Sequence, residues 1–302
     1  DGYIDRASVD LNSYYLQGGY FAENTSVKLI AFAGKEKTYH AWGYATKEEM
    51  EKFGRRYNPC GEMYTDADGN KHYYTDQTDN YLQKNYQLLL NHSFSTAWNL
   101  NVALHYTKGD GYYEEYKPGS SLVEYGLKPF NPDGTETNES DLVRQKKMDN
   151  KFGGGVFSLN YTGNRLTASL GGGLNQYRGN NFGKVTWVKN YIGNLSPEHE
   201  YYRNKSKKTD GNIYLKANYD LTSTLSAYAD LQYRHIDYTI DGVNDKYDWN
   251  KNALRPLAVD KKFDFFNPKV GLNWNITPNH RLYASFSVAQ KEPTRNNYTD
   301  GD

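Results

Sequence analysis

The stretch "GNIYLKANYDLTSTLSAYADLQYRHIDYT", residues 211–239, is typical of two strands joined by a tight turn at Thr222-Ser223-Thr224. In its second half, one set of small or apolar residues alternates with a set of mostly polar ones: Leu225, Ala227, Ala229, Leu231 and Tyr233 against Tyr228, Asp230, Gln232 and Arg234. A period of two residues indicates a β-strand whose two faces meet different surroundings.

Four further pairs of strands follow the same pattern. The predicted hairpins turn at Asn24-Thr25, Thr96-Ala97, Gly163-Asn164 and Thr277-Pro278-Asn279-His280. Small polar residues and glycine are the usual residues of such turns. The chain is therefore predicted to be all-β, with about ten antiparallel strands.

The segments between the hairpins are long, polar and rich in aromatic residues. We expect them at about Lys35–Asn80, Lys108–Lys147, Arg178–Asp210 and Asp241–Lys262. Long structureless loops are unusual in compact soluble domains. Strict alternation of short turns and long loops is instead typical of an outer-membrane β-barrel, whose long loops are extracellular.

Composition agrees with this interpretation. Mean hydropathy is −0.92, yet 30 Tyr, 12 Phe and 5 Trp argue against disorder. Lys+Arg and Asp+Glu balance at 36 each, so the net charge does not predict binding to nucleic acid. The apolar runs are too short for a membrane-spanning helix. The single cysteine, Cys60, excludes an internal disulfide framework.

In a membrane barrel, the apolar face of each strand meets lipid and the polar face lines the lumen. We therefore expect Asp230, Gln232, Arg234, Lys216 and Asn218 in the lumen. Aromatic residues near the strand ends are predicted to form the interfacial girdles: Trp98, Tyr106, Tyr161, Tyr219, Tyr233 and Trp274. A soluble β-sandwich with the same alternation is the alternative.

The stretch "YASFSVAQKEPTRNNYTDGD", residues 283–302, resembles the TonB-dependent outer-membrane receptors, and the opening "DGYIDRASVDLNSYYLQGGYF", residues 1–21, looks like their early barrel strands. Turns such as "DADGN" and "NPDGT" in a chain rich in Tyr, Asn and Gly are similar to Bacteroidetes members. The resemblance covers residues 1–302 as part of the barrel domain. No plug domain and no C-terminal barrel strands are recognisable in these residues.

The resemblance implies a 22-stranded barrel in the bacterial outer membrane, closed by a plug. It also implies uptake of a scarce nutrient, such as a siderophore, haem, cobalamin or an oligosaccharide, with energy from TonB. The implied partners are outer-membrane lipid, the plug domain, the TonB complex and the nutrient. No cofactor and no nucleic acid are expected, and no catalytic arrangement stands out, so an enzyme is not predicted.

Aromatic residues of the loops are the candidate ligand-binding groups, because flat rigid rings beside polar residues suit such ligands. They are Trp42, Tyr44, Tyr112, Tyr113, Trp187, Tyr191, Tyr201 and Tyr202. Packing of the loops against one another is the alternative role.

Three other features have a simpler interpretation. A solvated strand end is predicted at Lys291-Glu292-Pro293-Thr294-Arg295, because proline has no N–H group to donate to a neighbouring strand. Contact of this segment with ligand or plug is the alternative. Asp66-Ala67-Asp68-Gly69-Asn70 departs from the calcium-loop spacing and predicts a small hairpin. The histidines, including His40 and His72, lack metal-ligand spacing.

Two other functions fit the same strands. A passive porin or adhesive barrel would also show this alternation, and a soluble carbohydrate-binding β protein would place the aromatic loops on a sandwich. Selective, saturable binding of one nutrient separates a receptor from a porin.

Overall fold

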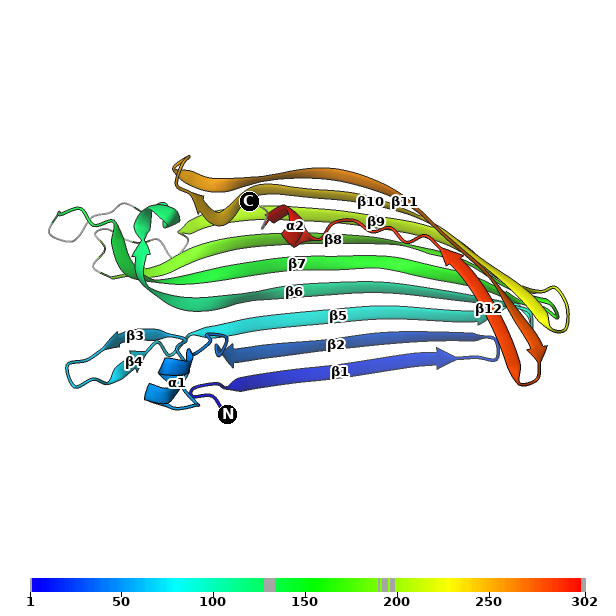
Figure 1. Ribbon diagram of the computed structural model, residues 1–302, viewed down its shortest axis with the longest axis horizontal. Coiled ribbons are helices and arrows are strands. Elements are labelled where there is room, and N and C mark those ends of the chain that lie inside the picture. Colours follow the sequence, from blue (N-terminus) through cyan, green and yellow to red (C-terminus); the bar gives the residue numbers. More distant parts are fainter. Residues whose placement is uncertain (1, 128–133, 190, 192–194, 196–198, 300–302) are drawn as a thin grey trace.

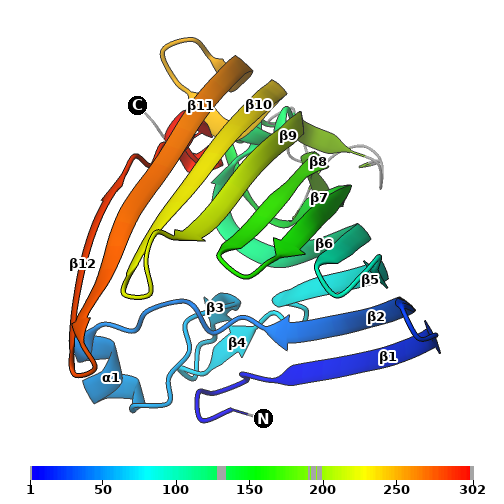
Figure 2. The same ribbon diagram turned by 90° about the vertical axis from the view of Figure 1, so that its right-hand side faces the viewer.

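The computed structural model describes residues 2–127, 134–189, 191, 195 and 199–299. Within them, ten strands form one antiparallel sheet in the order β1-β2-β5-β6-β7-β8-β9-β10-β11-β12. Figure 2 shows this sheet curving through an arc, with a concave and a convex side. The strands are β1 (Val9–Phe21), β2 (Thr25–Tyr39), β5 (Thr78–Ser93), β6 (Trp98–Ser121), β7 (Glu139–Thr162), β8 (Leu166–Val188), β9 (Glu200–Asp220), β10 (Leu225–Asp248), β11 (Ala253–Thr277) and β12 (His280–Ser287).

The two ends of the sheet differ as the sequence predicts. Short turns join the hairpins at one end, on the right of Figure 1. The other end carries the longer connections, which contain α1 (Lys47–Phe53), the hairpin of β3 (Glu62–Thr65) and β4 (Lys71–Tyr73), and the 3-10 helix η1 (Leu122–Tyr125). A short helix, α2 (Arg295–Thr299), follows β12. None of the described helices is long and apolar enough to cross a membrane.

Strand boundaries at the loop end were predicted wrongly. The expected connection Asp241–Lys262 is mostly strand, because β10 continues to Asp248 and β11 begins at Ala253. The expected loops Lys108–Lys147 and Arg178–Asp210 are likewise shortened from both sides by β6 to β9. Residues 131–133 of the predicted turn Asn131–Thr135 lie outside the described residues.

The convex side of the sheet carries a continuous apolar belt. On β10 it covers the alternate residues from Leu225 to Tyr233, which corresponds to about 26 Å of strand at about 3.3 Å per residue. Many large apolar side chains of the belt are solvent-exposed: Leu16, Leu29, Leu88, Leu104, Leu174, Leu215, Leu231, Leu272 and Leu282. An exposed apolar surface of this extent marks contact with another apolar phase. A tilted transmembrane strand crosses the hydrocarbon core in about 9–11 residues, which the nine residues from Leu225 to Tyr233 match.

Aromatic residues lie along both edges of this belt. Towards the short turns, Trp98 pairs with Tyr161, and their ring centroids are 4.9 Å apart. Towards the loops, Tyr86 pairs with Tyr106, and Tyr233 pairs with Phe266. Tyr219 and Trp274 also lie at the turn end, opposite Ala227 and Leu225. The six aromatic residues predicted for the girdles therefore lie at the belt's two edges.

Beyond the belt, the convex side becomes polar although the strands continue. On β10, Tyr233 is followed on the same face by His235 and Asp237. The His235 ring and the Asp264 carboxylate of β11 lie 2.7 Å apart. Beyond the belt the convex side is therefore polar, whereas the concave side of β10 carries the apolar Ile236, Tyr238 and Ile240, so the alternation seen in the belt is reversed.

Fully buried apolar side chains lie near the loop end rather than between two layers. One cluster joins Leu122 and Tyr125 of η1 to Leu142, Val185 and the paired rings of Tyr201 and Tyr202. The other contains Ile236, Tyr238, Ile240 and Leu257. The long connections are therefore anchored to the upper strands, and the belt has no core behind it.

Adjacent residues of one strand are expected to respond differently to the same substitution. Leu231 lies in the apolar belt, whereas Gln232 lies on the concave side and accepts a hydrogen bond from Asn267 Nδ2 at 3.4 Å. In the complete folded protein in lipid, Leu231→Arg is expected to lower the free energy of unfolding by roughly 2–4 kcal/mol, while Gln232→Arg changes it little. Denaturant unfolding in vesicles measures both, and equal losses would contradict the assignment of faces.

Candidate functional site: the concave face

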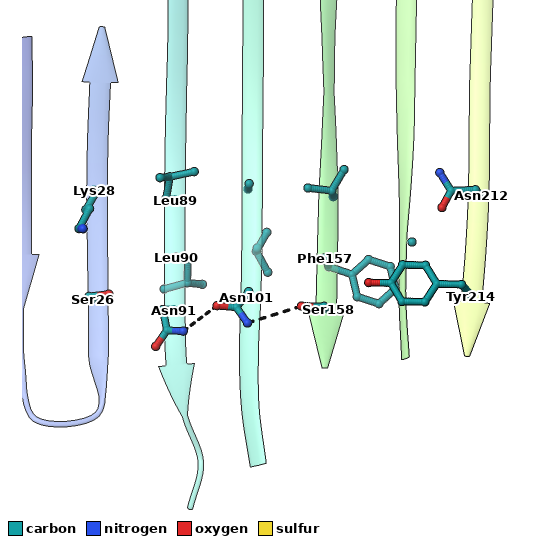
Figure 3. A pocket seen from close by; sticks show the side chains of 14 residues that line it. Ser26, Lys28, Leu89, Leu90, Asn91, Asn101, Phe157, Ser158, Asn212 and Tyr214 are labelled. Atoms are coloured by element: carbon teal, nitrogen blue, oxygen red, sulfur yellow. Dashed lines mark hydrogen bonds between the residues drawn. The ribbon is translucent and has the colours of Figure 1, made fainter. Parts of the chain in front are cut away.

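The lower part of the concave face, near the short turns, holds a cavity of about 470 Å³ that extends across β2 to β9. Figure 3 shows Lys28, Asn101, Asn212 and Tyr214 facing this space. The Tyr214 ring lies across β8 at Gly171, where a Cβ atom would come within 2.4 Å of its hydroxyl. Glycine at this position therefore leaves room for a ring that narrows the cavity.

A network of amides and hydroxyls fixes the wall of this lower cavity. Asn91 Nδ2 donates to Asn101 Oδ1 at 2.6 Å, and Asn101 Nδ2 donates to Asn99 Oδ1 at 2.8 Å. On the next strands, the hydroxyl of Ser169 donates to Asn160 Oδ1 at 2.6 Å. The network presents neutral donors and acceptors in fixed positions, as suits the polar surface of another protein segment or of a hydrophilic solute.

In the middle of the concave face, four charged side chains from distant parts of the chain meet. Arg234 contacts the Asp210 carboxylate at 2.5 Å and the Glu292 carboxylate at 3.1 Å. Glu292 also pairs with Lys208. The Glu292 side chain is only 10% exposed. The predicted solvated strand end is therefore wrong for this residue, because the segment after β12 folds onto β9 and β10.

Further contacts hold the same segment in place. Arg295 Nη2 donates to Asn204 Oδ1 at 2.7 Å, and Asn244 Nδ2 donates to the carbonyl of Thr299 at 3.0 Å. The rings of Tyr298 and Tyr238 lie 5.9 Å apart. Figure 1 shows α2 overlying the upper strands rather than continuing β12. Residues 288–299 thus occupy space on the concave side.

The upper part of the concave face holds a second cavity, of about 670 Å³. Tyr81, Tyr113 and Tyr202 line it together with Lys146. Carboxylates of Glu36 and Asp79 contribute to the same wall. The cavity therefore combines flat aromatic surfaces with charges of both signs, a composition suited to a bulky polar ligand.

Ion pairs hold the cationic groups beside this cavity. Arg144 donates from Nε and Nη2 to Glu115 Oε2 at 3.0 and 2.8 Å, and from Nη1 to the hydroxyl of Tyr125 at 3.0 Å. Lys146 pairs with Asp245 of β10. Because both cations are largely buried, these partners offset the cost of removing the charges from water.

The long connection after β2 places an aromatic stack beside the upper cavity. The rings of His40 and Trp42 lie 3.7 Å apart, and the Trp42 ring meets the edge of Tyr113 at 5.7 Å. His40 is buried, and neither of its ring nitrogens has a hydrogen-bond partner among the described residues. Burial lowers the pKa of His40. The ring is therefore neutral at pH 7.

The eight aromatic residues predicted to bind ligand do not form a single site. Tyr112, Tyr113 and Tyr202 line the upper cavity, and Trp42 contacts Tyr113. Tyr201 is buried among Tyr125 and Tyr202, and Tyr191 packs against the same cluster. Trp187 is near Tyr116, at 6.3 Å, and Tyr44 is 97% exposed. Their role in ligand binding stays a prediction.

The remaining sequence features take structural roles. Asp66–Asn70 forms the predicted hairpin turn between β3 and β4, where the Asp66 side chain accepts hydrogen bonds from the amides of Asp68 and Asn70. Within the described residues, no cluster of three or more His, Cys, Asp or Glu side chains could hold a metal ion. Cys60 is a buried free thiol.

The pairing of the concave-face charges was not predicted. Alternation places Arg234, Lys208 and Asp210 on one face, but the contact of Glu292 with Lys208 joins residues 84 positions apart. The signal that a contact existed was the charged run around Pro293. Its partners depend on how residues 288–299 fold back across the sheet.

Comparison with known proteins identifies the fold. Residues 29–302 match the family described as TonB dependent receptor-like, beta-barrel. The chain belongs to this family. Receptors of the family are outer-membrane proteins, and this chain is a segment of an outer-membrane β-barrel wall. No curated protein matches the sequence.

Solved structures of similar fold include three transport proteins. The open form of Fiu, the ferric-catecholate import receptor of E. coli K12, superimposes with a TM-score of 0.62 at 12% identity, covering 97% of this chain and 49% of Fiu. The unliganded ferric citrate transporter FecA superimposes with a TM-score of 0.61 at 9% sequence identity, covering 93% of this chain and 36% of FecA. The copper transporter OprC superimposes with a TM-score of 0.60 at 10% sequence identity, covering 96% of this chain and 38% of OprC. The chain thus spans half or less of each relative's length.

Acidification is expected to disturb the stack of His40 and Trp42. Because burial lowers the pKa of His40 below 6.5, the packing is stabilised by the neutral ring above that pH and loses this stabilisation as pH falls towards the lowered value. The fluorescence of Trp42 should therefore titrate with a midpoint below 6.5. Trp42→Phe should remove this transition, and His280→Gln should retain it. A midpoint at or above 6.5 would contradict the assignment.

Proposed function

We propose that this chain forms part of the barrel wall of a receptor that binds a scarce nutrient at the cell surface and imports it with energy from TonB. The ligand would be a siderophore, haem, cobalamin or an oligosaccharide. The observation that carries the proposal is the upper cavity, whose tyrosines and paired cations lie at the loop end of a receptor-family barrel. Transport rather than catalysis is the proposed activity.

The proposal also includes strands and a plug beyond those described. β1 and β12 each pair with one neighbour, so each leaves one row of backbone groups unpaired within the described sheet. Unpaired backbone groups cost several kcal/mol each in hydrocarbon. We propose that further strands of the same receptor pair with both edges and that a plug domain rests against the lower amide network.

Gated import accounts for the concave face better than passive diffusion does. Residues 288–299 fold over β9 and β10, where Glu292 is held by Lys208 and Arg234. A general porin keeps a water-filled channel, whereas this segment reduces the open cross-section. The porin and soluble-lectin alternatives therefore have less support than a receptor.

Uptake by the complete receptor tests the proposal. Cells expressing it are given labelled ferric siderophores, haem, cobalamin and oligosaccharides, with and without a functional TonB complex. One ligand class should show saturable, TonB-dependent uptake. Non-saturable entry of many solutes that persists without TonB would favour a porin and overturn the proposal.

A pair of variants tests the cavity itself. Tyr113→Ala removes an aromatic wall of the upper cavity and is expected to weaken binding of that ligand about tenfold or more, since central aromatic contacts are often worth about 2 kcal/mol. Tyr64→Ala, at an exposed position on β3 outside the cavity, should leave the Kd unchanged. Equal effects of the two variants on the Kd would exclude the cavity as the binding site.

A further inference from the structure

A row of five cations crosses the convex side of the sheet. Direct pairing of neighbouring strands aligns Lys84 with Lys108, Lys108 with Lys151, Lys151 with Arg178, and Arg178 with Lys207. Strands β5 to β9 therefore each place one positive side chain at the same rung of the ladder. Neighbouring strands are about 4.8 Å apart, so the five charges lie within about 19 Å.

Like charges directly opposite one another destabilise a sheet unless something neutralises them. Among the described residues, none of the five has a carboxylate within 4.0 Å, and the one hydrogen bond from their charged groups is that from Arg178 Nε to Gln176 Oε1. Asp110 and Asp149 occupy the next rung and pair with each other. Four of the five side chains are exposed, and that of Lys84 is half-buried.

The row begins where the apolar belt ends. Lys84 and Lys108 are two residues beyond Tyr86 and Tyr106, the aromatic pair at the belt's loop-side edge, and on the same face. On β8 and β9, the exposed apolar residues Leu174 and Ile213 of the same face lie four and six residues from Arg178 and Lys207, so the later members of the row lie further from the belt. A groove of about 520 Å³ is lined by the cations of Lys151, Arg178, Lys205 and Lys207 and by the carboxylates of Asp149 and Asp241.

We propose that this row binds the phosphate groups of anionic lipid in the outer leaflet of the outer membrane. Its charge is complementary to phosphate, and arginine and lysine are the usual phosphate-binding side chains. Its position at the edge of the belt, on the convex side, is continuous with the lipid-facing surface. Five aligned cations span more than one phosphate, which favours a multiply phosphorylated headgroup over a free ion.

Charge-neutral variants of the complete receptor test the assignment. The row variant carries Lys84→Gln, Lys108→Gln, Lys151→Gln, Arg178→Gln and Lys207→Gln. The control variant removes five exposed lysines elsewhere: Lys47→Gln, Lys52→Gln, Lys189→Gln, Lys251→Gln and Lys262→Gln. Native mass spectrometry measures binding of diphosphorylated lipid A and of the same lipid after removal of its phosphates.

The parent receptor and the control variant should bind the diphosphorylated lipid at least about tenfold more tightly than the dephosphorylated one, since basic side chains near a lipid surface attract anionic headgroups. The row variant should lose this preference. Millimolar inorganic phosphate should not displace the lipid. Equal binding of the two lipids by the parent, or an unchanged preference in the row variant, would overturn the proposal; displacement by phosphate would assign the row to free anions instead.

Thermal unfolding provides a second, independent readout. In detergent free of phosphorylated lipid, the five cations repel one another without a counterion. The row variant should then have a Tm at least as high as that of the parent, and added diphosphorylated lipid A should raise the Tm of the parent but not that of the variant. A lower Tm of the row variant in lipid-free detergent would show that the cations serve internal contacts and would contradict the proposal.

Discussion

The pairing of backbone hydrogen bonds between strands is the constraint on which the rest of this structure depends. Hydrocarbon offers no partner for an unpaired N–H or C=O group, so a chain that crosses it in strands must pair each strand with its neighbours. The ladder from β1 to β12 does this without interruption across the apolar belt. Once the register is fixed, each side chain of the belt faces either the lipid or the lumen.

The alternation of lipid-facing and lumen-facing side chains explains how a sequence with a mean hydropathy of −0.92 can form a membrane wall. In the belt, every second residue needs to be apolar, and small residues such as Ala227 and Ala229 suffice between larger ones. The other residues face a polar interior, where the cations of Lys208 and Arg234 neutralise the carboxylates of Asp210 and Glu292. Beyond the belt neither face needs to be apolar, and the strands continue with charged side chains outside.

Sequence patterns predicted the strands best where the two faces differ most. β1 (Val9–Phe21) lies in the opening stretch that was expected to form barrel strand, and the faces of Leu231 and Gln232 are correct. The loop-side ends were wrong because residues beyond the predicted end at Thr239, such as Asp241 and Gly242, resemble a polar connection when read alone. Their ladder partners on β9 and β11, which lie far away in sequence, keep them in strands.

The same limit applies to the candidate sites. Aromatic residues in the connections were visible in the sequence, but their division between the upper cavity and the packed cluster around Tyr201 depends on tertiary contacts. The contact of Glu292 with Lys208 and the alignment of Lys84 with Lys108 are products of register and chain reversal. No local pattern reveals either, because each requires knowledge of which residues are opposite.

A scan of single spin labels along β10 of the complete receptor in lipid vesicles tests the central claim most directly. Labels at 225, 227, 229, 231 and 233 should be accessible to oxygen dissolved in lipid and shielded from a water-soluble nickel complex. Labels at 235, 237 and 239 should reverse that preference, because they lie beyond the belt. If labels from 225 to 233 were shielded from both reagents, those residues would lie in a protein core, and the sheet would not be a membrane wall.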